Sequence, residues 1–278
     1  MENNIKSVLT ECGFSFKKKF GQNFITDKNL LASIVAGSGA GADDTVIEIG
    51  CGAGTLTREI AARCKRVIAF EVDTALKPVL EKTLAGVDNA EVVFRDFLKV
   101  DLKKLEEEVG EYSVIANLPY YVTTPLITKL LEEGKRCKSL TVMVQEEVAE
   151  RLCASENTPE YGAITAVIAV RASAHILKRV PRTMFTPRPN VDSAVVKLTV
   201  EEGRIPVKDE NAYKKVVHAA FLSRRKTLEN NLVNVFKLTR EQAQKLLLDC
   251  NIDLKARGET LSPLKFAELS DKSCEILK

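Results

Sequence analysis

Between residues 44 and 200, short apolar runs alternate with segments of helical character, and this alternation restricts the fold more than any other feature. The runs have the length of buried strands, and the segments between them have the length of crossover helices. Strands joined by helices pair in parallel, so the pattern predicts an α/β fold with a doubly wound sheet. The predicted strands are residues 45–49, 67–72, 91–95, 112–116, 139–145, 163–170 and 193–200, and the predicted helices are 28–36 (capped by Asp27), 56–64, 74–84 and 125–133.

The pattern changes near residue 203, where strand-like runs end. Beyond it, residues 211–222, 226–236, 240–250 and 263–269 have amphipathic helical spacing. We therefore expect an α/β domain over 1–203 and a small all-helical domain over 204–278. From Arg204 onward there are 15 Lys+Arg against 10 Asp+Glu, in a chain whose net charge is +3. A polyanionic partner would contact this helical domain, although a solvated helix face explains the charge equally well.

A glycine loop follows the first predicted strand, and acidic residues follow the next two. Gly50 and Gly52 allow a tight turn and a close approach of backbone to a ligand. Glu71 lies 21 positions after Gly50, where a carboxylate can accept both hydroxyls of a ribose, and Asp96 could accept an adenine amino group. The Gly-x-Gly-x-Gly spacing fits a dinucleotide poorly. It favours a nucleoside cofactor without a pyrophosphate.

The fourth strand ends in Asn117-Leu118-Pro119-Tyr120, which places a carboxamide and an aromatic ring at the carboxyl edge of the sheet. The Asn117 oxygen and the Leu118 carbonyl could accept hydrogen bonds from an amino group. The Tyr120 ring offers a stacking face for a flat base. We interpret the four residues as a holder for a planar amine; a simple strand-terminating turn is the alternative.

Other residue types argue against several classes of protein. The seven cysteines are scattered and never in Cys-x-x-Cys spacing, and there are only two histidines, so we expect neither disulfides nor a metal site. The polar first residues lack a signal-peptide core, and the longest apolar run, residues 163–170, is too short to span a bilayer. These features predict a soluble cytoplasmic protein with reduced thiols.

Taken together, the motifs resemble those of the ribosomal RNA adenine dimethyltransferases, a family that uses S-adenosyl-L-methionine. The resemblance runs nearly from end to end, which makes it specific. It implies a Rossmann-like methyltransferase sheet followed by a helical domain. The matching stretches are Phe20-Gly-Gln-Asn-Phe-Ile25, Glu48-Ile-Gly-x-Gly52, Asn117-Leu-Pro-Tyr-Tyr-Val-Thr-Thr-Pro125, Gln145-Glu-Glu-Val148, Tyr161-Gly162, Phe185-Thr-Pro-Arg-Pro-Asn-Val-Asp-Ser-Ala-Val-Val196 and Ala220-Phe-Leu-Ser-Arg-Arg-Lys-Thr-Leu228.

The resemblance also implies roles for individual residues. For the cofactor, Asn23 and the Ile25 backbone would close over its methionine end above Gly50, with Asn117 nearby. Glu71 would hold the ribose and Asp96 the adenine.

For the target base, Asn117 and the Leu118 carbonyl would accept from the amine. Tyr120 would stack on one side of the base and Phe185 on the other. Arg224, Arg225 and Lys226 would contact RNA.

The implied activity is dimethylation of the 6-amino groups of two adjacent loop adenosines near the 3′ end of small-subunit rRNA. The expected partner is that rRNA in an immature 30S particle, and the expected state is a monomer. One alternative is a resistance-type methyltransferase that acts on large-subunit rRNA. Another is an assembly factor that has kept the fold without catalysis.

Overall fold

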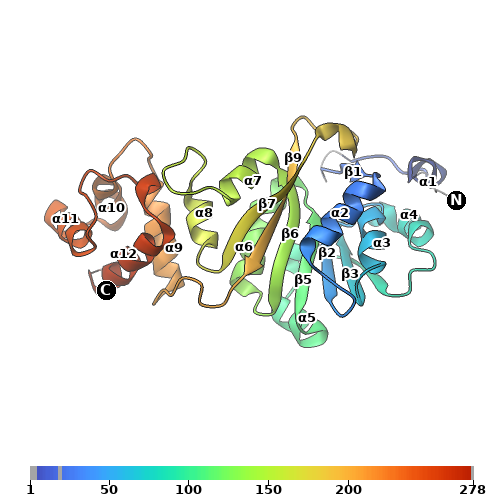
Figure 1. Ribbon diagram of the computed structural model, residues 1–278, viewed down its shortest axis with the longest axis horizontal. Coiled ribbons are helices and arrows are strands. Elements are labelled where there is room, and N and C mark those ends of the chain that lie inside the picture. The colour runs from blue at the N-terminus through green and yellow to red at the C-terminus, as the bar shows by residue number, and fades with distance from the viewer. Residues whose placement is uncertain (1–4, 18–20, 277–278) are drawn as a thin grey trace. The chain divides into compact units, whose positions relative to one another are not determined.

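The computed structural model describes residues 5–17 and 21–276, which form a seven-stranded sheet, a two-stranded sheet and a set of helices (Figure 1). The large sheet has the order β4-β3-β2-β5-β6-β9-β7, and the small sheet pairs β1 with β8. The strands are β1 Phe24–Ile25, β2 Thr45–Ile49, β3 Arg66–Glu71, β4 Ala90–Phe94, β5 Tyr112–Asn117, β6 Cys137–Gln145, β7 Ala172–Val180, β8 Phe185–Thr186 and β9 Ser193–Val200. The α-helices are α1 Ile5–Glu11, α2 Lys28–Ser38, α3 Thr55–Ala61, α4 Lys77–Thr83, α5 Leu102–Val109, α6 Thr123–Glu133, α7 Glu146–Leu152, α8 Ala163–Ile168, α9 Glu210–Ala220, α10 Leu228–Phe236, α11 Arg240–Asp249 and α12 Pro263–Ile276.

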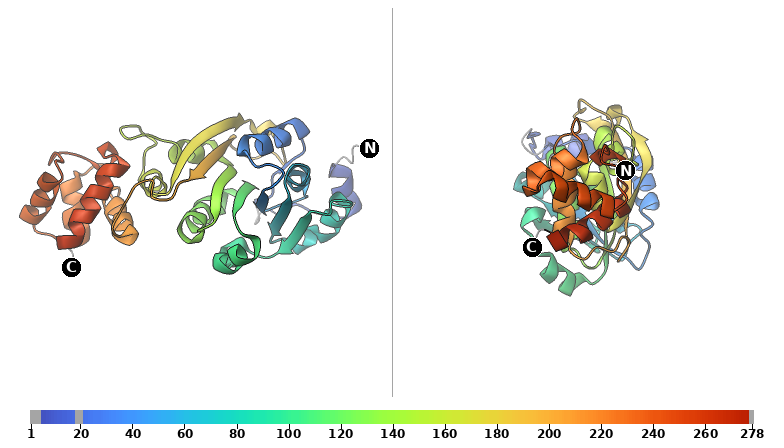
Figure 2. Two further views of the ribbon diagram at one scale, coloured as in Figure 1. Left: turned by 60° about the horizontal axis from the view of Figure 1, so that its bottom comes forward. Right: turned by 90° about the vertical axis from the view of Figure 1, so that its left-hand side faces the viewer.

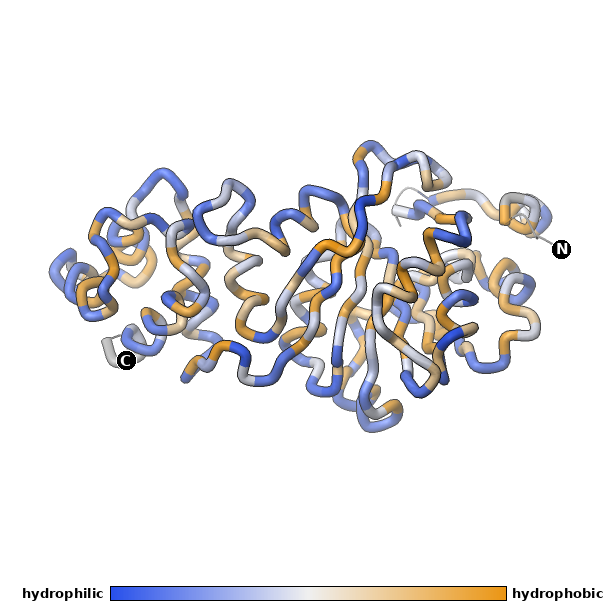
Figure 3. The backbone as a smooth tube through the Cα atoms, viewed as in Figure 1, coloured by the Kyte–Doolittle hydropathy of each residue, from blue (hydrophilic) through white to orange (hydrophobic). Residues whose placement is uncertain are grey.

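The central strands of the large sheet are rich in hydrophobic residues (Figure 3). Strands that are buried on both faces of a sheet have this composition. On one face, Val35 of α2 and Ile60 of α3 pack with Val46 of β2, and all three side chains are fully buried. Helices α5 and α6 lie on the opposite side from α2 (Figure 2). At the start of α2, the Asp27 side chain accepts a hydrogen bond from the Leu30 N–H at 2.7 Å, so the predicted cap is confirmed.

The order of the sheet positions the ligand site. From β2 the chain moves outward through β3 to β4, and it then returns to add β5 on the other side of β2. All these pairs are parallel, so their carboxyl ends share one edge. The point between β2 and β5 where the direction of winding reverses is where doubly wound sheets bind ligands.

The chain divides into two compact units. The first contains the described residues up to Ala149 together with His175–Val200, and the second contains Glu150–Ala174 and the described residues from Glu201 onward. In the second unit, Phe266 of α12 and Val217 of α9 belong to one buried core. None of the helices in the described part of the chain has the length and hydropathy of a membrane span.

The structure corrects the prediction for residues 163–170. This run is not a strand but helix α8, which packs with the C-terminal helices through the hydrogen bond from the Tyr213 hydroxyl to the Ala166 carbonyl at 2.8 Å. The segment Glu150–Ala174 therefore belongs to the helical unit, whereas the single boundary near 203 had placed it with the sheet. A short apolar run cannot be distinguished from a buried helix by its pattern alone.

Candidate active site

A pocket opens at the carboxyl ends of β2, β3 and β5 and is also lined by the N-terminal segment at 21–25. The pocket brings together every residue that we predicted in the sheet domain except Phe185. The predicted residues in its wall are Asn23, Ile25, Gly50, Glu71, Asp96, Asn117, Leu118 and Tyr120. Residues from Gly50 to Tyr120 share one cavity because the parallel strands end at the same edge, and the N-terminal segment adds Asn23 and Ile25.

The glycine loop is folded back onto strand β3. The N–H groups of Gly50 and Cys51 both donate to the Phe70 carbonyl, at 2.8 and 3.2 Å. Gly52 has a φ of +56°, and a Cβ added there would lie 2.9 Å from the Phe24 ring. Glycine at 52 therefore serves both the left-handed backbone and the close approach of the N-terminal segment.

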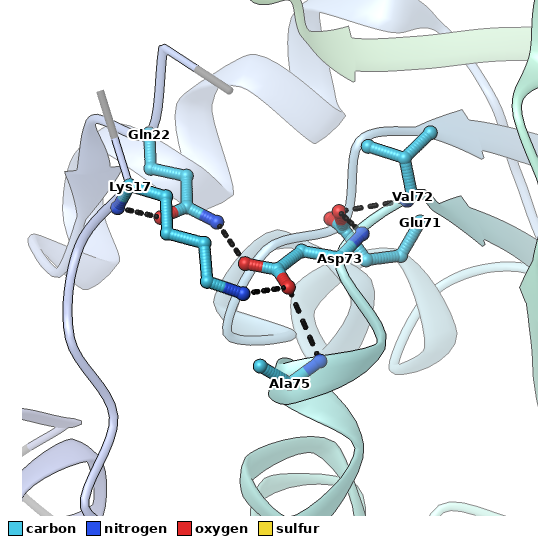
Figure 4. A network of polar contacts seen from close by, with 6 residues as sticks. All are labelled: Lys17, Gln22, Glu71, Val72, Asp73 and Ala75. Atoms are coloured by element: carbon cyan, nitrogen blue, oxygen red, sulfur yellow. Dashed lines mark hydrogen bonds and ion pairs between the residues drawn. The ribbon is translucent and has the colours of Figure 1, made fainter. Parts of the chain in front are cut away.

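Glu71 is a buried carboxylate held by backbone donors. It accepts from the Gly52 N–H at 2.9 Å through Oε2. It also accepts from the Val72 and Asp73 N–H groups at 2.8 and 2.9 Å through Oε1 (Figure 4). Burial raises the pKa of the Glu71 carboxyl, and these three hydrogen bonds oppose the rise. A carboxylate has about four acceptor sites, so one in-plane site on Oε2 stays available for a ribose hydroxyl. The geometry therefore supports one hydrogen bond from a ribose hydroxyl to Glu71, whereas we expected Glu71 to accept both hydroxyls.

Asp96 follows β4 and caps the short 3₁₀ helix η3 (Phe97–Lys99). Its Oδ1 accepts from the Leu98 N–H at 3.0 Å, which fixes the carboxylate at the pocket wall. The Oδ2 atom is the remaining acceptor that could take the amino group of a nucleobase.

Asn117 ends β5 with its amide oriented by the N-terminal segment. Its Nδ2 donates to the Asn23 carbonyl at 2.9 Å, so its Oδ1 is left as an acceptor. The next residue, Leu118, is anchored by its N–H to the Met143 carbonyl at 3.2 Å. Among the described residues no donor is bonded to the Leu118 carbonyl, which leaves a second acceptor beside Oδ1.

Tyr120 lines the pocket from the short 3₁₀ helix η4 (Tyr120–Val122), and its hydroxyl is hydrogen-bonded to the fully buried Ser193 Oγ at 2.9 Å. Burial raises the pKa of the Tyr120 hydroxyl. The bond to Ser193 fixes the ring, as a stacking face requires.

Phe185 is the predicted site residue that the structure does not bring to the pocket. It lies in β8 opposite Ile25, is 4% exposed and packs in a core cluster with Leu31 and Val195. Its ring is covered in this structure, so the expected stacking position is not observed. Stacking on a base would require the ring to leave that cluster.

Glu48 is a pocket residue whose chemistry the sequence patterns did not reveal. It is 1% exposed in the middle of an apolar strand, and its Oε2 has no hydrogen-bond partner within the described residues. Burial raises the pKa of the Glu48 carboxyl to about 8; the nearby Thr57 hydroxyl opposes the rise, and the negative charge of Glu71 adds to it. The signal that could have identified it is an acidic residue at a buried position of the run Thr-Val-Ile-Glu-Ile.

The predicted RNA-contacting residues Arg224, Arg225 and Lys226 form an exposed turn between α9 and α10 in the second unit. Arg224 Nη1 donates to the Pro159 carbonyl at 2.8 Å. Below the turn, the fully buried Asn231 donates from Nδ2 to the carbonyls of Ala220 and Ser223. These hydrogen bonds fix the conformation of the turn, which presents a basic surface. Its contact with RNA stays a prediction. Of the lysines at 17–19, whose RNA contacts we left open, positions 18 and 19 lie outside the described residues.

The fold and the pocket together define a class of protein. A glycine loop after β2, carboxylates after β3 and β4 and an amide acceptor after β5 are the parts of a Rossmann-like S-adenosylmethionine-dependent methyltransferase that acts on an amine. Within residues 5–17 and 21–276, no group of three His, Cys, Asp or Glu side chains is arranged to hold a metal ion.

Comparison with known proteins narrows the class to one family. The family model "Ribosomal RNA adenine dimethylase" matches residues 13–270. The chain is 46% identical to the Ribosomal RNA small subunit methyltransferase A of Bacillus licheniformis, over 98% of this chain and 96% of that protein. It is also 46% identical to the protein of that name from Geobacillus thermodenitrificans, over 96% and 94%. The chain therefore belongs to the ribosomal RNA adenine dimethylase family.

Solved structures agree with this fold. A dimethyladenosine transferase from Plasmodium falciparum superposes with a TM-score of 0.76 at 24% identity, covering 88% of this chain and 95% of that one. The 23S rRNA methyltransferase ErmE superposes with a TM-score of 0.69 at 25% identity, covering 90% and 99%. The Rossmann-like methyltransferase sheet followed by C-terminal helices, predicted from the sequence, is confirmed.

Proposed function

We propose that this protein transfers methyl groups from S-adenosylmethionine to the 6-amino groups of two adjacent adenosines near the 3′ end of small-subunit rRNA. The observation that carries the proposal is the 46% identity over almost the whole length of relatives named for the small subunit. The substrate in this proposal is the rRNA in an immature 30S particle, on which the protein acts as a monomer in the cytoplasm.

The pocket fits the cofactor in three respects. The loop at Gly50–Gly52 leaves backbone exposed in the pocket wall, Glu71 keeps one acceptor for a ribose hydroxyl, and Asp96 keeps one for the adenine amine. When bound, the cofactor supplies an electrophilic methyl group on a sulfonium. The residues around it need only position the nucleophile in line, so most of the catalytic gain comes from orientation.

The target amine needs help because its lone pair is delocalised into the adenine ring. Asn117 Oδ1 and the Leu118 carbonyl are acceptors on consecutive residues of the pocket wall, and together they can hold both N–H groups of the amine. Two acceptors out of the ring plane favour a tetrahedral nitrogen, whose lone pair then points away from them. In this mechanism Asn117 and Leu118 carry the reaction, and Tyr120 holds the base by stacking.

The base must leave its stack to reach such a pocket, so the substrate is a loop adenosine that can be splayed out at low cost. The exposed turn of Arg224, Arg225 and Lys226 supplies positive charge for the RNA backbone. Most of the affinity for the particle would then be electrostatic and sensitive to salt.

The direct test is a methylation assay with the purified protein and labelled cofactor. Small subunits that lack the modification are compared with naked large-subunit rRNA, and the modified nucleotides are mapped. We expect two dimethyladenosines in the small-subunit rRNA and none in the large. Transfer to the large-subunit rRNA alone would replace our proposal by the resistance-type activity, for which the structural similarity to ErmE is the supporting observation.

A protein that binds the particle but transfers nothing would instead be an assembly factor. The intact acceptors at Asn117 and Leu118 argue for catalysis. Binding of the particle without turnover in the presence of bound cofactor would favour the assembly role.

A further inference from the structure

Beside the cofactor pocket, three polar side chains connect the N-terminal segment to the turn after β3 (Figure 4). Lys17 Nζ donates to Asp73 Oδ1 at 2.6 Å, and Gln22 Nε2 donates to Asp73 Oδ2 at 2.9 Å. The Lys17 backbone N–H donates to Gln22 Oε1 at 2.9 Å. The three residues close a ring of hydrogen bonds across more than fifty positions of sequence.

The ring specifies the orientation of the Gln22 amide at both ends. Its Oε1 must accept from a backbone N–H, and its Nε2 must donate to a carboxylate. A flipped amide would break both bonds, so Gln22 distinguishes a partner that accepts from one that donates. The Asp73 side chain is only 3% exposed, which makes an unpaired or repelled group there costly.

Charge supports the same arrangement. Burial by itself raises the pKa of the Asp73 carboxyl. The hydrogen bonds from Lys17, Gln22 and the Ala75 N–H, together with the positive charge of Lys17, outweigh this effect, and the pKa lies below its ordinary value. Asp73 is therefore an anion that the N-terminal segment holds, and a charged acceptor strengthens both bonds.

The ring lies between the two halves of the site. On one side, the Asp73 N–H donates to Glu71 Oε1, the carboxylate placed at the ribose. On the other side, Gln22 precedes Asn23, whose carbonyl receives the Asn117 amide. A continuous series of hydrogen bonds and one peptide link thus runs from the cofactor carboxylate to the amide that faces the target amine.

We propose that Gln22 and Asp73 are positioning residues whose hydrogen bond couples cofactor binding to the placement of the Asn117 amide. Contact of the cofactor with Glu71 steadies the Asp73 turn, the turn holds Gln22, and Gln22 holds the Asn23 carbonyl at its 2.9 Å separation from Asn117 Nδ2. The coupling rests on the proposed role of Asn117. It uses no contact with RNA.

The test exchanges donor and acceptor across the Gln22–Asp73 bond. Gln22→Glu keeps the acceptor for the Lys17 N–H but sets an oxygen against Asp73 Oδ2. Asp73→Asn sets a donor against the Gln22 donor. The double variant Gln22→Glu/Asp73→Asn restores one donor and one acceptor with the same net charge, and the Asn oxygen can still accept from Lys17.

Two quantities are measured for each variant: the dissociation constant of S-adenosylmethionine by calorimetry, and the single-turnover rate of methyl transfer at saturating cofactor. We expect each single variant to lose roughly tenfold to a hundredfold in cofactor affinity and about tenfold in rate, as for a broken charge-assisted hydrogen bond. The double variant should recover the cofactor affinity and the rate to within a few-fold of wild type, because the restored hydrogen bond between residues 22 and 73 offsets the losses of the two single variants.

The control is Glu11→Gln, which breaks the exposed ion pair to Lys82 Nζ at 3.2 Å, another link between the N-terminal segment and the same unit. It should change neither quantity. Unchanged values in the single variants, or a double variant no better than the worse single one, would overturn the coupling, as would a rate that stays at wild type while affinity falls.

The affinity measurement needs no RNA. A wild-type protein that binds cofactor but leaves small subunits unmethylated would therefore refute the proposed substrate and not the cofactor side of this inference.

Discussion

Replacing Glu48 by glutamine should change how the stability of the protein depends on pH. Glu48 is 1% exposed, one of its oxygens has no partner among the described residues, and burial raises its pKa from 4.5 to about 8. Glutamine has nearly the same shape but cannot ionise. The substitution therefore removes the titration and leaves the packing of β2 almost unchanged.

The direction in which stability changes with pH follows from which state, folded or unfolded, keeps the Glu48 proton. Between pH 4.5 and about 8 the folded protein keeps the Glu48 proton and the unfolded chain has lost it, so wild-type stability falls as pH rises through this window. Each pH unit costs up to ~1.4 kcal/mol, and the whole window corresponds to about 3–5 kcal/mol. Below pH 4.5 both states hold the proton, and the contribution is fully present.

The assay is urea unfolding at pH 5 and pH 8.5 without cofactor. The free energy of unfolding of wild type, relative to Glu48→Gln, should fall by about 4 kcal/mol between the two pH values. Using this difference between two pH values cancels any constant cost of burying the amide.

The matched control is Glu106→Gln, another carboxylate that is only 5% exposed. Glu106 accepts from the Tyr112 hydroxyl at 3.2 Å and from the N–H groups of Lys135 and Arg136 at 2.8 and 3.0 Å. Its substitution should lower stability by ~1–3 kcal/mol at neutral pH, because all three bonds meet at Oε1 and a neutral amide oxygen accepts them less strongly than a carboxylate oxygen does. Parallel pH curves for wild type and Glu48→Gln would refute the reasoning about burial.

Three further predictions concern the proposed activity. Asn117→Ala should lower the rate of methyl transfer more than a hundredfold, as loss of a transition-state contact does, while calorimetry shows less than a tenfold change in cofactor affinity. Equal losses in rate and in cofactor affinity would mean that Asn117 acts in binding. Glu71→Ala should weaken cofactor binding by at least tenfold, because one ligand acceptor and three backbone partners are lost, and unchanged calorimetry would exclude Glu71 from the site. Neutralising Arg224, Arg225 and Lys226 should weaken binding to small subunits and flatten its salt dependence by about two to three in slope, whereas an unchanged slope would make the turn structural.

Most of the sheet could be predicted from the sequence because its strands are short, apolar and separated by helices. The predictions for β2 and β9 match the structure to the residue, and those for β3, β4, β5 and β6 lie within two residues. Strand β7 was missed, since it forms an edge of the sheet and most of its side chains are at least partly exposed. The segment α8, which precedes β7 in the chain, was taken for a strand because a run of six mostly apolar residues is too short to distinguish the two periods.

The site was predictable where its residues follow strand ends. Gly50, Glu71, Asp96 and Asn117 meet in one pocket because parallel strands in register end together. Phe185 lies five residues after the end of β7, an edge strand that the sequence did not reveal, and its position depends on the pairing of β1 with β8. No local pattern specifies that pairing, which buries Phe185 in a core cluster, and its stacking on a base stays a prediction.

By itself, then, the sequence determined the parallel part of the sheet, the family and most of the residues at the sheet edge, because these follow from local periodicity and from motifs. The antiparallel pairing of β9 with β6 was decided only by the tertiary structure. The tertiary structure alone decided how those residues are held. The orientation of the Asn117 amide depends on the Asn23 carbonyl, 94 positions away, and the partners of Asp73 lie 51 and 56 positions away. The raised pKa of Glu48 likewise comes from burial beneath other elements. Hydrogen-bond partners and local dielectric are properties of neighbours in space, which the order of residues along the chain does not specify.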